Sequence, residues 1–225
     1  MTPTPSPQIK VLVVDDHAVV REGICALLKL ARDFLLVGEA RNGREAVQMA
    51  HTHRPDVILM DLAMPVLNGV EATKQILATN PAARVLVLSA HSDEAYVERA
   101  ITAGAAGFIE KQSVVDILTK GIREIARGRA YFSPMIGRRL QADRSKSCNR
   151  EGWPRANPTQ PTSRESEVLQ LVAEGSANKQ IAADLGISIK TVEKHRQRIM
   201  DKIHIHETAG LTRYAIDMGV VESGV

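Results

Sequence analysis

Short apolar runs alternate five times with longer amphipathic segments in the first half of the chain. The runs are rich in Val, Ile and Leu, which favours buried β-strands, and they cover residues 9–14, 34–40, 55–60, 84–88 and 107–109. The segments that follow them repeat apolar residues at spacings of three and four, which is typical of helices. Because each helix must cover a face of the sheet, the alternation predicts a doubly wound, five-stranded parallel α/β sheet.

The second half of the chain has no strand signal. The apolar periodicity disappears after residue 127. Residues 127–158 carry a net charge of +6, whereas the net charge of the whole chain is only +3. Four helical segments then appear from residue 162 onward, and Thr162 with Glu165 has the spacing of a capping box. We therefore expect three parts: an α/β domain over 8–127, a basic flexible linker over 128–160 whose first residues could dock, and a small all-α domain over 161–221.

Composition excludes several classes of protein. No run approaches the ~18 apolar residues that a membrane span requires, and the polar, proline-rich N-terminus lacks the features of a secretory signal. The two cysteines, Cys25 and Cys148, form neither a disulfide framework nor a zinc spacing. We expect a cytoplasmic protein with no membrane partner.

Charged and hydroxyl side chains follow the predicted strands. The first strand runs into Asp15 and Asp16, and the third ends at Asp61. The fourth ends at Ser89, and the fifth runs out into Lys111. Because the carboxyl ends of parallel strands share one edge of a sheet, we expect these groups to lie close together.

Three carboxylates at one edge would repel each other unless a cation neutralises them. Mg²⁺ prefers oxygen ligands and suits a few carboxylates with an incoming phosphate. Asp61 is then a candidate nucleophile towards a phosphoryl group, with Lys111 offsetting charge on the transferred oxygens. Taken singly, Asp15 and Asp16 could only cap a helix and Lys111 could be a solvated charge; their joint occurrence at successive strand ends favours the site.

Four motifs in this order resemble a bacterial response-regulator receiver domain, which has a flavodoxin-like fold: VVDDH at 13–17, DLAMPVLNGVEAT at 61–73, SAH at 89–91 and FIEKQS at 108–113. The resemblance implies that Asp61 is the phosphoacceptor. It implies a metal set of Asp15, Asp16, Asp61 and the backbone carbonyl of Ala63, a switch pair of Ser89 and Phe108, and Lys111 as the counter-charge of the phosphate.

The segment at 178–200 indicates a helix-turn-helix. Gly186 permits the positive φ that ends the first helix, and Val192, Ile199 and Ile203 recur at helical spacing in the second. That second helix carries five basic and two acidic side chains, which suits a polyanion such as DNA. By itself, a basic helical face is more often simply solvated.

The stretches TSRESEVLQLVAEG, NKQIAADLGIS and KTVEKH resemble the LuxR-type DNA-binding domain, so the whole chain resembles the NarL/FixJ class of response regulators. This implies two groups of DNA contacts. Those directed at the major groove are Lys190, Thr191, Glu193, Lys194 and Gln197; those nearer phosphates are Asn178, Lys179 and Arg198.

The apolar residues of the closing helical segment have two interpretations. Leu211, Ile216 and Met218 could form part of a dimer surface, or they could pack against neighbouring helices. The sequence does not separate these interpretations.

The sequence predicts a transcription regulator of a two-component system. A sensor histidine kinase would phosphorylate Asp61, and phosphorylation would favour a homodimer or release a masked recognition helix. The protein would then bind paired promoter half-sites in double-stranded DNA. RNA polymerase is a candidate partner. Apart from self-phosphorylation and self-dephosphorylation at Asp61, we expect no enzyme activity. The alternative is a phosphorylation-independent DNA-binding regulator whose receiver is a protein-interaction module. A phosphohydrolase is disfavoured because it predicts an acid at position 63, where Ala63 stands.

Overall fold

The computed structural model describes residues 8–90, 94–133, 136 and 161–221. Its first domain contains a parallel sheet with the strand order β2-β1-β3-β4-β5-β6. The strands are β1 (Ile9–Val14), β2 (Phe34–Ala40), β3 (Val57–Asp61), β4 (Val85–Ser89), β5 (Gly107–Glu110) and β6 (Tyr131–Phe132). The doubly wound α/β architecture is confirmed, but the prediction of five strands is wrong because the sheet has six.

The sixth strand lies inside the segment predicted to be linker. Tyr131 pairs with Gly107 and Phe132 pairs with Phe108, which places β6 beside β5. A two-residue strand has too few positions to show alternation, so pairing with β5 decides its structure. The docked start that the sequence allowed is therefore present, and residues 137–160 of the predicted linker lie outside the described residues.

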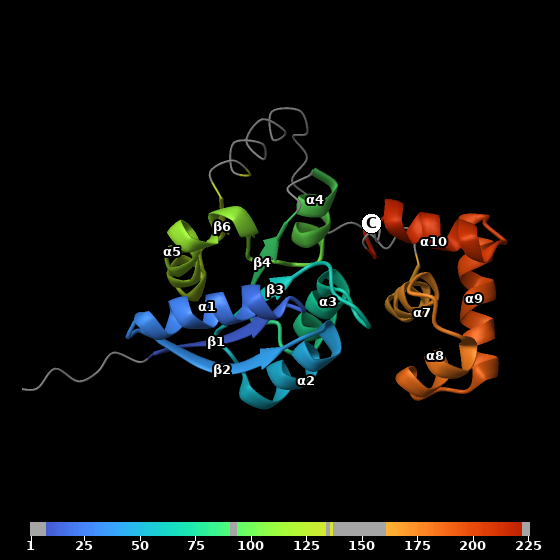
Figure 1. Ribbon diagram of the computed structural model, residues 1–225, viewed down its shortest axis with the longest axis horizontal. Helices are drawn as coiled ribbons and strands as arrows, with labels where there is room; N and C mark the ends of the chain where they lie inside the picture. The colour runs from blue at the N-terminus through green and yellow to red at the C-terminus, as the bar shows by residue number, and fades with distance from the viewer. Residues whose placement is uncertain (1–7, 91–93, 134–135, 137–160, 222–225) are drawn as a thin grey trace, which may run out of the picture.

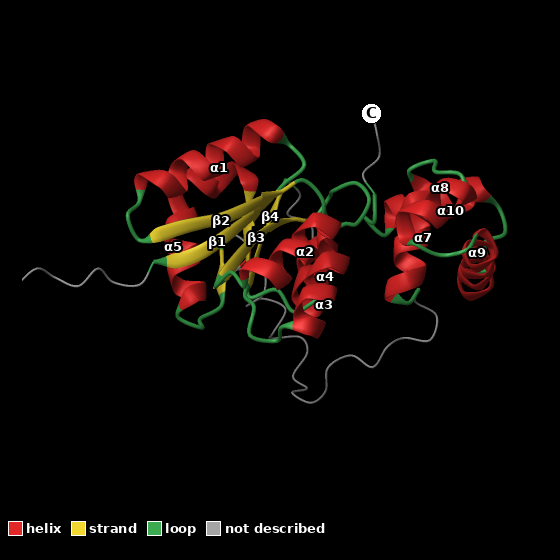
Figure 2. Cartoon of the chain, turned by 90° about the horizontal axis from the view of Figure 1, so that it is seen from below, coloured by secondary structure: helices red, strands yellow, loops and turns green. Residues whose placement is uncertain are grey.

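Helices cover both faces of this sheet (Figure 2). Two of them pack on one face, and apolar side chains of β1, β3, β4 and β5 fill the space beneath them. Three others pack on the opposite face. The first pair is α1 (Ala18–Leu30) and α5 (Val114–Ala126), the latter preceded by the 3₁₀ turn η1 (Lys111–Ser113); the second group is α2 (Gly43–His53), α3 (Gly69–Thr79) and α4 (Glu94–Thr102).

Strand register brings the candidate side chains to one edge. Val14 pairs with Met60, so the residues that follow β1 lie beside the end of β3. Asp61 pairs with Leu88, one residue before Ser89. The order of the strands therefore places groups from β1, β3, β4 and β5 around the same point, as the sequence predicted.

The second domain is a small helical unit with its own apolar core. Thr162 and Glu165 close the predicted capping box, and Gly186 ends a helix with φ at +62°. Leu211 is fully buried in this core, so packing within the domain explains that residue of the closing helix. The helices are α7 (Ser163–Ala173), α8 (Asn178–Leu185), α9 (Ile189–Ile203) and α10 (Thr208–Asp217).

The two domains contact each other through α3 and α7 (Figure 1). A second contact lies at the end of α10, where a Cβ on Gly219 would come within 2.8 Å of the Tyr96 ring on α4. The helix α9 lies on the side of its domain away from the sheet (Figure 1). Within the described parts of the chain, every helix is too short or too polar to cross a bilayer.

Candidate functional site

An acid cluster lies where β1 and β3 end. Four side chains can each offer one ligand atom, and these atoms all lie within 4.8 Å of one another: Asp15, Asp16, His17 and Asp61. Asp15 and Asp61 are buried, whereas Asp16 keeps part of its side chain exposed. The three predicted carboxylates therefore meet, and solvent can reach them from the side of Asp16.

Lys111 lies between the two buried carboxylates. Its Nζ is 2.7 Å from Oδ2 of Asp61 and 2.9 Å from Oδ2 of Asp15. The pKa of Asp61 rises to about 6 because burial outweighs the opposing charge and hydrogen bond of Lys111, with Asp15 and Asp16 raising it further. Burial lowers the pKa of Lys111, but the two carboxylates raise it more, so the ammonium stays charged.

Two further residues at this cluster, His17 and Arg21, were not predicted from the sequence. His17 donates its backbone N–H to Asp15, and its Nδ1 lies 2.8 Å from Oδ1 of Asp16. Arg21 is buried in α1, donates from Nη1 to the Asp15 carbonyl at 2.8 Å, and lies 3.4 Å from Glu39. An arginine on the apolar face of a predicted helix was the available signal for Arg21, since a buried cation requires acceptors.

The remaining receiver candidates lie within the expected strands or shortly after them. Ser89 is buried at the end of β4, and Phe108 is fully buried in β5 opposite Val87. Ala63 lies in the loop that joins β3 to α3, two residues after Asp61. Ser89 ends β4 and Lys111 directly follows the neighbouring strand β5, so both lie at the edge that holds the acids.

This β3–α3 loop, residues 62–68, is closed tightly against the acid cluster. The N–H of Gly69 donates to the Leu62 carbonyl at 2.8 Å. A Cβ on Gly69 would overlap the carbonyl oxygen of Asp61, so only glycine fits there. The close approach fixes where the loop begins and ends relative to Asp61.

The donor set suits a hard divalent cation. Three carboxylates supply oxygen ligands, and the loop after Asp61 can supply a backbone carbonyl; Mg²⁺ prefers such ligands and retains waters. His17 adds a nitrogen at the rim, but carboxylate oxygens dominate the cluster. The residues present therefore fit the magnesium expected from the sequence.

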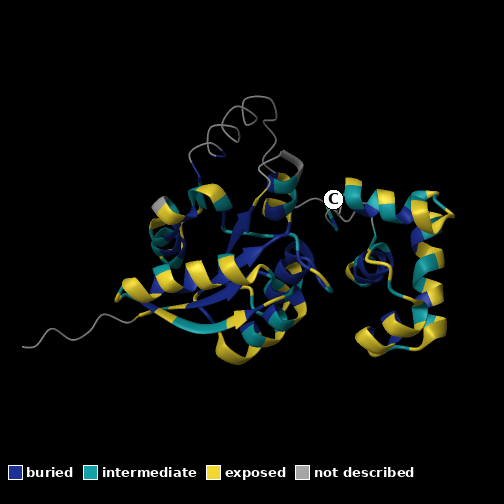
Figure 3. Ribbon diagram, viewed as in Figure 1, coloured by how far each residue is buried: buried dark blue, intermediate teal, exposed yellow. Residues whose placement is uncertain are grey.

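The helix-turn-helix presents most of its candidate side chains to solvent. Ser188 caps α9 by accepting from the Thr191 N–H, and the buried Val192 and Ile199 anchor the helix in the core. Thr191 and Asn178 are half-buried, and the other candidates are exposed: Lys179 on α8, and Lys190, Glu193, Lys194, Gln197 and Arg198 on α9. Figure 3 shows that exposed residues recur along α9.

Arg196 was not among the predicted contacts, and it has a structural role within the domain. It donates to Oδ1 of Asn178, the first residue of α8, and to Oγ1 of Thr208, the first residue of α10, each at 3.0 Å. These bonds fix α8 and α10 relative to α9. The side-chain amide oxygen of Asn178 is engaged in the same contact.

An acid cluster paired with a lysine at the edge of a parallel sheet, joined to a helix-turn-helix domain, defines a DNA-binding response regulator. The family model described as "Response regulator receiver domain" matches residues 11–123, and that described as "Bacterial regulatory proteins, luxR family" matches residues 161–215. The chain therefore belongs to the two-component response regulators of the NarL/FixJ class.

Curated relatives match over nearly their whole length. The chain is 34% identical to the transcriptional regulatory protein DegU of Brevibacillus brevis, with 96% of each chain covered. It is 36% identical to the transcriptional regulatory protein MctR of Rhizobium johnstonii, covering 97% of this chain and 98% of that one. Both are similar to this chain in the two domains together.

Solved structures agree with this assignment. A LuxR-family two-component response regulator from Aurantimonas has 34% identity and a TM-score of 0.59, covering 61% of this chain and 99% of that one. The RcsB response regulator of Salmonella typhimurium has 25% identity and a TM-score of 0.57, covering 93% and 98%. That structure of RcsB describes conformational dynamism for DNA interaction.

Proposed function

We propose that Asp61 accepts a phosphoryl group from a sensor histidine kinase and that this controls dimerisation and promoter binding. The geometry that carries the proposal is the Lys111 ammonium, which lies within 2.9 Å of both Asp61 and Asp15 at the open end of the sheet. A carboxylate in this position has a cation ready to offset the charge of three phosphoryl oxygens.

The reaction is a transfer between two side chains. An oxygen of the Asp61 carboxylate attacks phosphorus, and the bond from phosphorus to the kinase imidazole nitrogen breaks, with its electrons returning to the imidazole. With a pKa of about 6, Asp61 is mostly ionised at neutral pH and can act as the nucleophile. Magnesium held by Asp15, Asp16, Asp61 and the Ala63 carbonyl would neutralise charge on the phosphoryl oxygens.

The same residues account for self-phosphorylation from a small donor and for self-dephosphorylation by water at Asp61. Ser89 would donate a hydrogen bond to a phosphoryl oxygen by rotating towards Asp61. The fully buried Phe108 would then move into the space that Ser89 leaves, which changes the surface around α4, β5 and α5. This is the switch that we assign to the receiver, residues 8–127 with the docked strand β6.

DNA binding is assigned to the domain of residues 161–221. Lys190, Thr191, Glu193, Lys194 and Gln197 would face base edges in the major groove. Asn178, Lys179 and Arg198 would lie near phosphates, and the basic segment 128–160 joins the domains. A homodimer would place two α9 helices about one turn of DNA apart, ~34–36 Å, on paired half-sites, with RNA polymerase as a candidate further partner.

Phosphorylation with a small phosphodonor and Mg²⁺, read by intact mass and by operator binding, tests the proposal. We expect one phosphoryl adduct that is absent in Asp61→Asn, together with tighter binding to paired half-sites. Undiminished DNA binding without an adduct would support the regulator whose receiver only binds proteins. Sustained release of phosphate at many turnovers would indicate a phosphohydrolase.

A further inference from the structure

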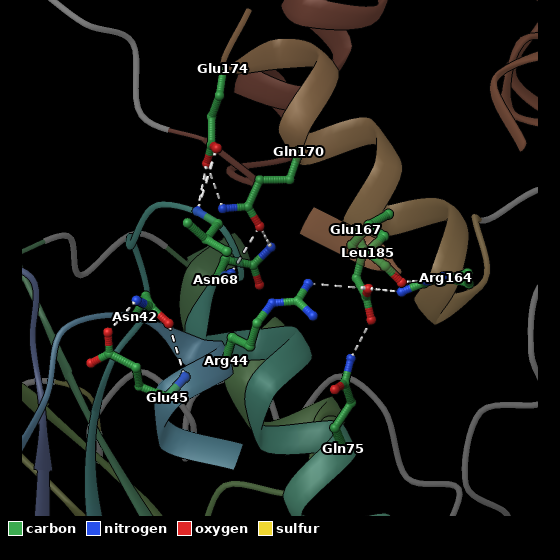
Figure 4. Close-up of polar contacts among 11 residues, drawn as sticks. Asn42, Arg44, Glu45, Asn68, Gln75, Arg164, Glu167, Gln170, Glu174 and Leu185 are labelled. Atoms are coloured by element: carbon green, nitrogen blue, oxygen red, sulfur yellow. Dashed lines mark hydrogen bonds and ion pairs between the residues drawn. The ribbon is translucent and has the colours of Figure 1, made fainter. Parts of the chain in front are cut away.

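The side chain of Gln170 joins the DNA-binding domain to the loop that follows Asp61 (Figure 4). It lies in α7 and is fully buried. Its Oε1 accepts from the backbone N–H of Asn68 at 2.8 Å and from Asn68 Nδ2 at 3.0 Å. Its Nε2 donates to the Met64 carbonyl at 2.8 Å and to Glu174 at 2.8 Å.

All four hydrogen-bonding positions of this amide are therefore used, and three of the partners belong to the β3–α3 loop. A buried amide is costly unless its polar atoms are satisfied. The buried position of Gln170 is therefore stable only while the loop keeps this conformation, and the same hydrogen bonds stabilise the loop.

A second residue of α7's end contacts the middle of the loop. The carboxylate of Glu174 accepts from the Val66 N–H at 3.1 Å. Val66 has φ at +71°, and the N–H of Leu67 donates to the Pro65 carbonyl, so Val66 is the central residue of a tight three-residue turn. A β-branched residue rarely adopts this conformation, so surrounding contacts must hold it.

Further contacts keep α7 in this position against α2 and α3. Glu167 is buried and accepts from Nε2 of Gln75 at 2.7 Å. Arg44 of α2 lies 3.9 Å from the same carboxylate, as Figure 4 shows. These contacts position the helix, whereas Gln170 and Glu174 reach the backbone of the loop itself.

We propose that Gln170 is a positioning residue for the phosphorylation site: by bonding to Met64 and Asn68 it holds the β3–α3 loop in the conformation of the unphosphorylated chain and so slows phosphoryl transfer to Asp61. This rests on the proposed function of Asp61. Met64 directly follows Ala63, so Gln170 holds the peptide next to the Ala63 carbonyl that is expected to bind the metal. A loop held in this way resists any change of conformation that phosphoryl transfer to Asp61 requires.

The coupling works in both directions. If docked α7 disfavours the phosphorylated loop, phosphorylation must disfavour docked α7 by the same factor. Apart from the half-buried Thr191, the side chains of α9 that are candidates for DNA contact remain exposed in the docked chain, so masking of the recognition helix is not needed. What phosphorylation would release is the whole domain, which then becomes free to pair on two half-sites.

The full-length protein tests this with acetyl phosphate and Mg²⁺, using the initial rate of adduct formation at Asp61. Gln170→Leu keeps the size of the side chain but removes every hydrogen bond, and we expect phosphorylation about fivefold faster or more. A rate equal to or below that of the wild type overturns the inference, while a wild-type adduct still supports the function of Asp61. Absence of any adduct in the wild type overturns both.

Two further variants keep the result interpretable. Gln180→Leu is the matched control, because Gln180 is exposed on α8 and its amide bonds to Asp184 in the same helix; its rate should equal the wild-type rate. Glu174→Ala removes an exposed side chain, so it should fold, and we expect a rate about twofold higher or more. If Gln170→Leu does not fold, an unchanged rate in Glu174→Ala overturns the inference.

Amide hydrogen exchange gives a readout that general destabilisation would not reproduce. The amides of Val66 and Asn68 should be protected in the unphosphorylated wild type and should lose protection when beryllofluoride, a phosphoryl mimic, is added with Mg²⁺. In Gln170→Leu the Asn68 amide should exchange fast before the mimic is added, while the amides of β3 stay protected. Protection of Asn68 that survives the mimic contradicts the proposed coupling.

Discussion

The Nζ of Lys202 lies 2.6 Å from Oε2 of Glu165, which ties the last turn of α9 to the first turn of α7. The same carboxylate oxygen accepts from the Thr162 N–H and so completes the capping box of α7. Burial raises the pKa of Glu165, but the hydrogen bonds from Lys202 and Thr162 lower it more, and the net shift is downward. One buried carboxylate therefore holds the candidate recognition helix against the domain core.

Replacement of Lys202 by methionine should destabilise the DNA-binding domain by about 2 kcal/mol, because Glu165 loses its charged partner while staying buried. Because the pKa of Glu165 is lowered on folding, its carboxylate stabilises the folded protein at pH values above the ordinary pKa of 4.5. This stabilisation is lost as the pH falls through the lower pKa of the folded state. The difference between the two proteins should therefore shrink below about pH 4 in denaturant unfolding curves. Lys194→Met, at an exposed site of the same helix, should change stability little.

Asp61→Asn should raise the free energy of unfolding in magnesium-free buffer. The folded pKa of about 6 lies above the ordinary 3.8, so this carboxyl favours folding when protonated and loses that advantage as pH rises from about 4 to 6. Asparagine does not ionise, so the variant does not lose this stability. Its free energy of unfolding should exceed that of the wild type by roughly 2–3 kcal/mol at pH 7, and the difference should vanish near pH 4. Urea unfolding at several pH values measures it, and a gain independent of pH would contradict the stated cause. Added Mg²⁺ should narrow the gap by stabilising the wild type.

Val66→Gly should stabilise the receiver by about 1 kcal/mol. A φ of +71° strains a β-branched residue by roughly 1–3 kcal/mol, and glycine adopts it without this strain. Glycine loses more conformational entropy on folding, which offsets part of the gain. Val115→Gly is the opposite case, since Val115 is exposed within α5, and it should destabilise. Thermal unfolding of both variants checks this, and a lower melting temperature for Val66→Gly would count against strain at this turn.

Lys194→Ala and Lys179→Ala should weaken DNA binding in different ways. Loss of a base contact from Lys194 should cost about 1–3 kcal/mol on the operator and relax the preference at one base pair. Loss of a phosphate contact from Lys179 should weaken binding similarly on all sequences and reduce the salt dependence by about one ion. Fluorescence anisotropy on operator and scrambled duplexes over a salt series separates the two. Identical sequence profiles for both variants would contradict the assigned roles.

Much of the fold and of the candidate site could be predicted because the signals are local. Apolar spacing marked the strands and helices, and Asp61 and Lys111 follow strands that a parallel sheet brings to one edge. The strand β6 was missed because two residues carry no period. Arg21 and His17 were missed because their importance depends on where their partners Asp15, Glu39 and Asp16 lie.

The sequence by itself determined the two domains, the order of elements and the residues at the strand ends, since each follows from periodicity and from the geometry of a parallel sheet. Only the tertiary structure decided that Lys111 contacts both Asp15 and Asp61, and that Gln170 bonds to the loop after Asp61 across more than a hundred positions of chain. The sequence around a glutamine in an amphipathic helix does not indicate which distant residues it will bond to. The role of Gln170 arises when packing removes it from water, because its amide is then satisfied by Met64 and Asn68 of the other domain together with Glu174.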